Sequence, residues 1–148
     1  MRAPVRGWSP VLGAAAILLL GVSGSRAAAA QTGTPPLVAQ APRLVVLDLP
    51  YEKVWANTLR ALDQYPIERT ADGVVVIRRV ERAPRAEESG FDRVAERITV
   101  RVDGFGPGST RIAVEVLAEG RRDGKWLPIA DTEATARAVL DRVRAAQS

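Results

Sequence analysis

The chain contains neither cysteine nor histidine in its 148 residues. Without cysteine it cannot form a disulfide, use a thiol as a nucleophile or bind a metal through thiolates. Without histidine it lacks the side chain that most often serves as a general base or as a metal ligand. These absences remove the commonest catalytic and metal-binding groups.

The chain also lacks a clustered excess of basic residues outside its first segment. It has 21 Lys and Arg against 17 Asp and Glu. Arg2, Arg6 and Arg26 lie in the first 30 residues, which contain no acid, so 18 basic and 17 acidic residues remain from Gln31 onward. Nucleic-acid binding depends on a concentrated basic surface. We therefore expect no nucleic-acid partner.

The first thirty residues have the three parts of a secretory signal peptide. Arginines occur in residues 1–10, the apolar run VLGAAAILLLGV fills residues 11–22, and small residues at 27–30 precede Gln31. This order predicts cleavage near Ala30 and Gln31. The apolar run is shorter than the ~20 residues that a membrane span needs, although an uncleaved anchor is the alternative. Without cysteine the chain cannot become a lipoprotein.

The bias toward arginine over lysine, with abundant alanine, valine and glycine, is typical of a GC-rich bacterial genome. We therefore predict a periplasmic or secreted protein with no membrane span after signal cleavage. Residues 31–42 contain three prolines and no charge, which predicts a flexible lead-in. Residues 43–148 are enough for a single domain with one hydrophobic core.

The most regular pattern in residues 43–148 is a helix that begins at Pro50–Tyr51 and ends just after Tyr65, before Pro66. Its apolar stripe consists of Tyr51, Val54, Trp55, Thr58, Leu59 and Leu62, at helical spacing. A second helix begins at Asp131 or Thr132, and its inward stripe consists of Ala136, Val139, Leu140 and Val143. Strands are predicted at 44–47, 67–70, 74–80, near 98–102, at 111–116 and at 125–129. The sequence thus predicts an α+β domain in which both helices pack on one face of an antiparallel sheet of about five or six strands, in the order β-α-β-β-β-β-β-α.

No set of residues predicts a catalytic, cofactor or metal site. The glycine-rich segment 104–109 precedes a strand and not a helix, which favours a hairpin connection over a phosphate-binding loop. The densest acidic cluster, Glu87, Glu88, Asp92 and Glu96, lies among arginines without the spacing of a calcium loop. We interpret it as a solvated charge run in residues 81–95, the longest irregular stretch.

Two predicted strands are apolar at consecutive positions, in the runs Leu44–Leu47 and Val74–Ile77. Helices on one side of the sheet cover only one of the two faces. The second face could curl around a cavity, be covered by residues 81–95 or be presented to a partner. Trp126, on a short strand, fits either a binding rim or a lid on the core. The candidate interaction surface consists of Val45, Leu47, Val75, Ile77, Phe91 and Trp126.

The segment LDLPYEKVWANTLRALDQYPIERTADGVVVI, over residues 47–77, resembles the helix-grip domains of BamC and related bacterial envelope proteins. The shared features are a strand that enters Pro50–Tyr51, the pair Val54–Trp55, and a strand that follows Gly73. The later segment ERITVRVDGFGPGSTRIAVEV fits the same pattern, so that the resemblance covers Leu44 to about Ala145. The opening also looks like the START/Bet v 1 helix-grip proteins, which hold apolar ligands.

These resemblances imply two functions. The BamC-like one implies a non-enzymatic periplasmic interaction or assembly module with an envelope protein as its partner. The START/Bet v 1-like one implies a small carrier or sensor of an apolar molecule. Neither implies a cofactor.

Overall fold

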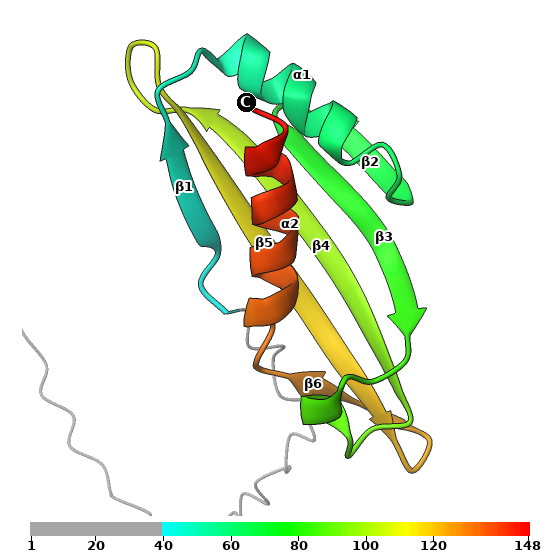
Figure 1. Ribbon diagram of the computed structural model, residues 1–148. Coiled ribbons are helices and arrows are strands. Elements are labelled where there is room, and N and C mark those ends of the chain that lie inside the picture. The colour runs from blue at the N-terminus through cyan, green and yellow to red at the C-terminus, as the bar shows by residue number, and fades with distance from the viewer. Residues whose placement is uncertain (1–39) are drawn as a thin grey trace, which may run out of the picture. The chain divides into compact units, whose positions relative to one another are not determined.

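The computed structural model describes residues 40–148 (Figure 1). The predicted signal peptide and all of the lead-in before Gln40 lie outside the described residues. Residues 40–148 contain one six-stranded antiparallel sheet and two α-helices in the predicted order. The elements are β1 (Arg43–Leu47), α1 (Tyr51–Ala61), β2 (Ile67–Ala71), β3 (Val74–Arg82), the short 3-10 helix η1 (Ala86–Glu88), β4 (Arg93–Gly104), β5 (Thr110–Arg122), β6 (Lys125–Ile129) and α2 (Glu133–Ala145).

The strands lie side by side in the order β1-β5-β4-β3-β2. The long β4–β5 hairpin is the centre of the sheet, paired from Gly104 with Thr110 to Arg93 with Arg121. β1 and β6 both pair with β5, at residues 110–114 and 118–122 respectively. Both short strands therefore lie along the same side of β5.

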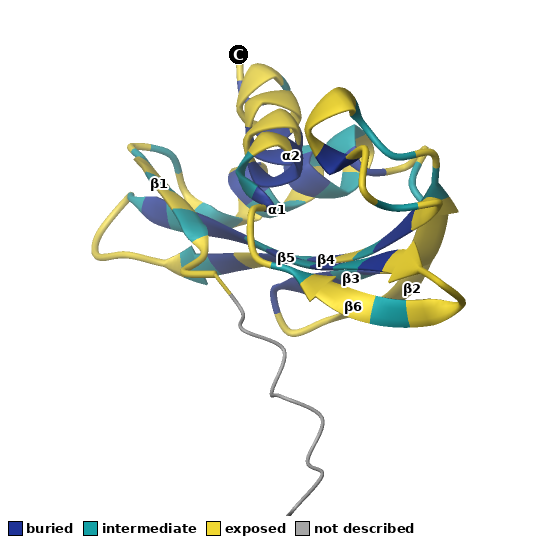
Figure 2. Cartoon of the chain, turned by 90° about the horizontal axis from the view of Figure 1, so that it is seen from below, coloured by how far each residue is buried: buried dark blue, intermediate teal, exposed yellow. Residues whose placement is uncertain are grey.

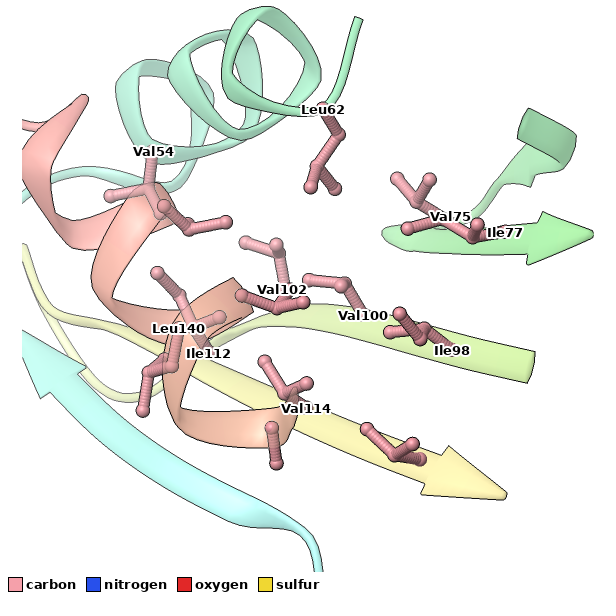
Figure 3. Packing of buried hydrophobic residues seen from close by; sticks show 14 residues of the cluster. Val54, Leu62, Val75, Ile77, Ile98, Val100, Val102, Ile112, Val114 and Leu140 are labelled. Carbon is pink, nitrogen blue, oxygen red and sulfur yellow. The ribbon is translucent and has the colours of Figure 1, made fainter. Parts of the chain in front are cut away.

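Both helices pack on one face of the sheet, as the apolar stripes predict (Figure 2). Val54 of α1 and Leu62, which directly follows α1, are fully buried, and Tyr51 and Trp55 pack against the core at its margin. The predicted inward stripe of α2 is likewise buried. These side chains meet alternate residues of the strands in one contiguous cluster (Figure 3). The sheet residues of this cluster are Val75, Ile77, Ile98, Val100, Val102, Ile112, Val114 and Val116.

Two Asp-Gly pairs form tight turns between neighbouring strands. Asp72 and Gly73 join β2 to β3 with φ of 51° and 74°, and Asp123 and Gly124 join β5 to β6 with φ of 51° and 75°. Two successive positive φ angles are those of a type I′ hairpin turn, which favours Asp-Gly. The glycine-rich segment after Gly104 connects the paired strands β4 and β5. This confirms the predicted hairpin connection.

The charged stretch 81–95 is more regular than the sequence predicts. β3 continues to Arg82, and β4 begins at Arg93, because Arg82 pairs with Val94 in the sheet. Only residues 83–92 lie outside strands, and they include η1. The Arg85 side chain donates a hydrogen bond to Thr135 of α2 at 2.8 Å. This connection therefore lies on the helix side and does not cover the other face of the sheet. Within residues 40–148 no helix has the length and apolar character to cross a membrane.

Candidate interaction surface

The structure corrects the candidate surface that the sequence predicts. Val75 and Ile77 are at most 2% exposed and belong to the core under the helices. Val45 and Leu47 are partly buried and pack against the same core. These four residues therefore point toward α1 and α2 and belong to the core side of the sheet, not to an exposed surface.

The cause of this error is the alternation of side chains along a strand. Successive residues point to opposite faces, so half of each four-residue apolar run faces the helices. The other half lies on the face of the sheet turned away from α1 and α2, here called the open face. On β1 these residues are Leu44 and Val46, which are 57% and 46% exposed. On β3 they are Val74 and Val76.

The two aromatic residues of the predicted surface lie near one end of the sheet on different faces. Phe91 is half-buried on the helix side, where its ring packs over Gly120, with the Arg122 guanidinium 4.8 Å from the ring centre. Trp126 pairs with Arg121 on the open face, and the Arg79 guanidinium lies 4.4 Å from its ring centre. Trp126 is therefore a rim aromatic and not a lid on the core.

The open face is not flat. A depression of about 280 Å³ lies over Ala113, between Leu44 of β1 and Arg101 of β4. These three residues pair directly across β1, β5 and β4, so they lie in one row on one face. Because alanine has the smallest side chain in this row, its position forms the floor and its longer neighbours form the walls. The depression is hereafter called the Ala113 hollow.

A second, smaller depression lies toward the β6 end of the open face. It has a volume of about 210 Å³ and is lined by Arg79, Ala95, Arg97, Leu117 and Glu119. It repeats the arrangement of the Ala113 hollow, with an alanine on a central strand and long side chains around it. Alanine is depleted in strands because it fills a pleated surface poorly. Both hollows therefore have the same cause.

Charged side chains surround the two hollows. The ion pairs of the open face are Arg97–Glu68 at 2.9 Å, Arg79–Glu81 at 3.3 Å, Arg79–Glu119 at 3.5 Å and Arg111–Asp103 at 3.2 Å. The register also places Arg69, Arg93, Arg101 and Arg121 on this face. None of these four has an ion-pair partner within residues 40–148, and neither does Glu115. The open face thus has a positive surplus that the nearly balanced charge of residues 31–148 conceals.

The helix side carries a different charged group, and it corrects the interpretation of Glu88 and Glu96 as part of a solvated charge run. Glu88 of η1 is only 7% exposed. Both of its carboxylate oxygens accept hydrogen bonds from the Arg82 guanidinium, at 2.6 and 2.7 Å, and one also accepts from the Arg85 backbone N–H at 2.8 Å. Arg82 also donates to Glu96 at 2.6 Å, and the Thr135 hydroxyl donates to the same oxygen at 2.7 Å. This network joins β3, η1, β4 and α2.

The network fixes the ionisation of Glu88 and Arg82. Hydrogen bonds from Arg82 lower the pKa of Glu88 from 4.5 to about 2, against the opposing effect of burial. The same hydrogen bonds raise the pKa of Arg82 above its usual value. A carboxyl group with so low a pKa is ionised near neutral pH and is a poor proton donor there. The chemistry of Glu88 is therefore that of a structural anchor for the connection between β3 and β4.

No family model matches the chain, and no curated protein matches it. Among solved structures, one that is similar is the crystal structure of an uncharacterised protein from Bacillus thuringiensis. The two are 13% identical, with a TM-score of 0.31, over 72% of this chain and 93% of the other. The α+β assignment rests on the sheet and helices described above.

Proposed function

We propose that this chain is a non-enzymatic binding module of the bacterial cell envelope, which holds a partner protein on the open face of its sheet. The observation that carries this proposal is that the exposed side chains of Leu44 and Val46 lie beside the Ala113 hollow on the same face of the sheet. None of residues 43–148 covers this side of the sheet (Figure 2). Apolar side chains that gather on an accessible surface are typical of protein-binding sites.

The proposed location depends on the sequence of residues 1–30. Their basic start, short apolar run and small residues before Gln31 are the features of a secretory signal. Export would place the domain in the periplasm, and the resemblance to BamC-like helix-grip domains supports an envelope partner. We propose membership of that group on the segments Leu47–Ile77 and Glu96–Val116.

A carrier of an apolar ligand, the alternative implied by the sequence, would need a cavity between α2 and the sheet. Val100, Val139 and Val143 lie there, at most 2% exposed, and they belong to one packed cluster. A filled interior favours binding on the surface over binding inside. We therefore favour the protein-binding module.

Photo-crosslinking in the native cell tests this function. A photoreactive amino acid at Val46 should give one discrete covalent adduct with an envelope protein, and the same adduct should form from Leu44. Val80 provides the control because it is the same residue type with similar exposure, 42% against 46%, on the helix side of the sheet. A probe at Val80 should give no such adduct.

Two results would contradict the proposal. One is the absence of any adduct from both Leu44 and Val46 when the exported protein is present at its native level. The other is the same adduct at equal yield from Val80, because this would show contact without preference for the open face.

A further inference from the structure

We infer that the partner binds through an acidic segment, which places an apolar side chain in the Ala113 hollow and a carboxylate against Arg101. This inference rests on the proposed function, because it names the chemistry of the protein that would occupy the open face. It follows from the shape of the hollow and from the arrangement of charges around it.

The hollow has the dimensions of a site for a side chain. Its volume of about 280 Å³ lies just below the ~300–1,000 Å³ of pockets that enclose small ligands. Pro42 and Leu44 form an apolar wall at the β1 side, and Ala113 forms the floor. An aliphatic or aromatic side chain from a protein laid across the sheet would bury the exposed part of Leu44. This contact would supply the apolar part of the binding.

Arg101 supplies the charged part. It lies directly across from Ala113 on one side and Val74 on the other, so both of its cross-strand neighbours are apolar. Its guanidinium has no ion pair among the described residues, whereas nearby Arg111 is paired with Asp103. A carboxylate is the anionic group that proteins most often present to such a planar donor. Arg101 is therefore the available contact for an acidic side chain next to the hollow.

The surrounding charges favour an acidic segment over a single acidic residue. Arg69 and Arg101 lie in neighbouring rows on one side of the open face, and Arg93 and Arg121 lie directly opposite each other near Trp126. Like charges directly opposite in a sheet repel each other, so an anionic partner would relieve this repulsion. Among the described residues, Glu115 is the acid at the rim of the hollow that has no ion pair, and it would turn the carboxylates of the partner toward Arg101. Complementary charge of this kind selects partners and speeds encounter.

An anionic membrane would also be attracted to these arginines, but the shape favours a protein. Surfaces that insert into a bilayer present protruding apolar residues. Here the apolar floor is recessed beneath long charged side chains. A recess of this form accepts a protruding side chain from another protein.

The test uses the Val46 crosslinking probe in the native cell, combined with charge reversal at Arg101. Arg101→Glu should reduce the yield of the adduct about tenfold, because it replaces attraction by repulsion at the contact. The matched control is Arg137→Glu, which makes the same charge change on an exposed position of α2. It should leave the yield within about twofold of the parent. Mass spectrometry of the adduct should find the probe attached to a peptide with more Asp and Glu than Lys and Arg.

The outcomes separate the inference from the proposed function. An adduct whose yield is unaffected by Arg101→Glu, or that joins a basic or neutral peptide, would overturn the inference and leave the open face as a binding site. The absence of any adduct would contradict both the inference and the proposed function. If the purified exported chain sediments with phosphatidylglycerol vesicles, and Arg101→Glu abolishes this binding, the open face binds an anionic membrane and the inference is wrong. If Arg101→Glu does not fold, Arg101→Gln should reduce the yield about threefold.

Discussion

Replacing Gly73 with alanine should destabilise the domain by about 2–4 kcal/mol, whereas Gly124→Ala should cost only about 1 kcal/mol. Both glycines occupy the second position of an Asp-Gly turn, with φ of 74° and 75°. A Cβ atom at either position therefore meets the same backbone strain. At Gly73, however, it would lie 2.4 Å from the backbone oxygen of Val102, whereas at Gly124 it would meet nothing within 4 Å.

The difference in the free energy of unfolding between these two variants measures how closely the β2–β3 turn approaches β4. The Gly73 carbonyl accepts a hydrogen bond from the Val102 N–H at 2.7 Å, so the turn cannot move away without losing that contact. Urea denaturation of the wild type and of both variants gives the three free energies of unfolding. Equal losses at the two positions would show that the turn does not contact β4 in this way.

Acidification should remove about 3 kcal/mol of stability that the Glu88 carboxylate contributes at neutral pH. The folded-state pKa of Glu88 is about 2, below the ordinary value of 4.5, because Arg82 binds the ionised form. A group with a lowered folded-state pKa stabilises the fold above its unfolded-state pKa. The contribution is therefore complete above about pH 5 and falls as the pH decreases from 4.5 toward 2.

Glu88→Gln isolates this effect. At pH 7 the variant should be less stable by about 2–3 kcal/mol, because it leaves the Arg82 charge only partly compensated in a half-buried site. Its stability should also depend less on pH between 5 and 2 than that of the wild type. Glu87→Gln is the matched control, since Glu87 is the exposed neighbour in η1. Thermal unfolding measures the stability of both variants across this pH range. If the Glu88 and Glu87 variants lost the same stability at pH 7 and showed the same pH dependence, Glu88 would not be the source of the effect.

The sequence predicts the order of elements because local signals mark most of them. Asp72–Gly73 specifies a tight turn by backbone conformation alone, and the stripe through Val54 and Thr58 specifies which side of α1 is buried. These signals depend on residues close together in the chain. They are therefore readable without knowing how the sheet pairs.

The face of the apolar strands could not be predicted in the same way. Val74–Ile77 is apolar at every position, so it has no alternation from which to assign its sides. The register shift in β3 after Ile77 adds a further change of side within one strand. The network of Arg82, Glu88 and Glu96 was missed for a related reason. It forms only when β3, η1 and β4 come together, and in sequence it is indistinguishable from a solvated charge run.

The pairing of β1 has a consequence for how the domain folds. β2 through β6 are joined in sequence to the strands with which they pair, whereas β1 pairs with β5. The hydrogen bond from Thr110 to the Leu49 carbonyl joins residues that are 61 positions apart. Closing a long loop costs more conformational entropy than closing a hairpin, and contacts of this kind slow folding. β1, which carries Leu44 and Val46, therefore joins a sheet whose other strands can assemble by successive local hairpins. The Ala113 hollow is complete only once β1 has paired with β5.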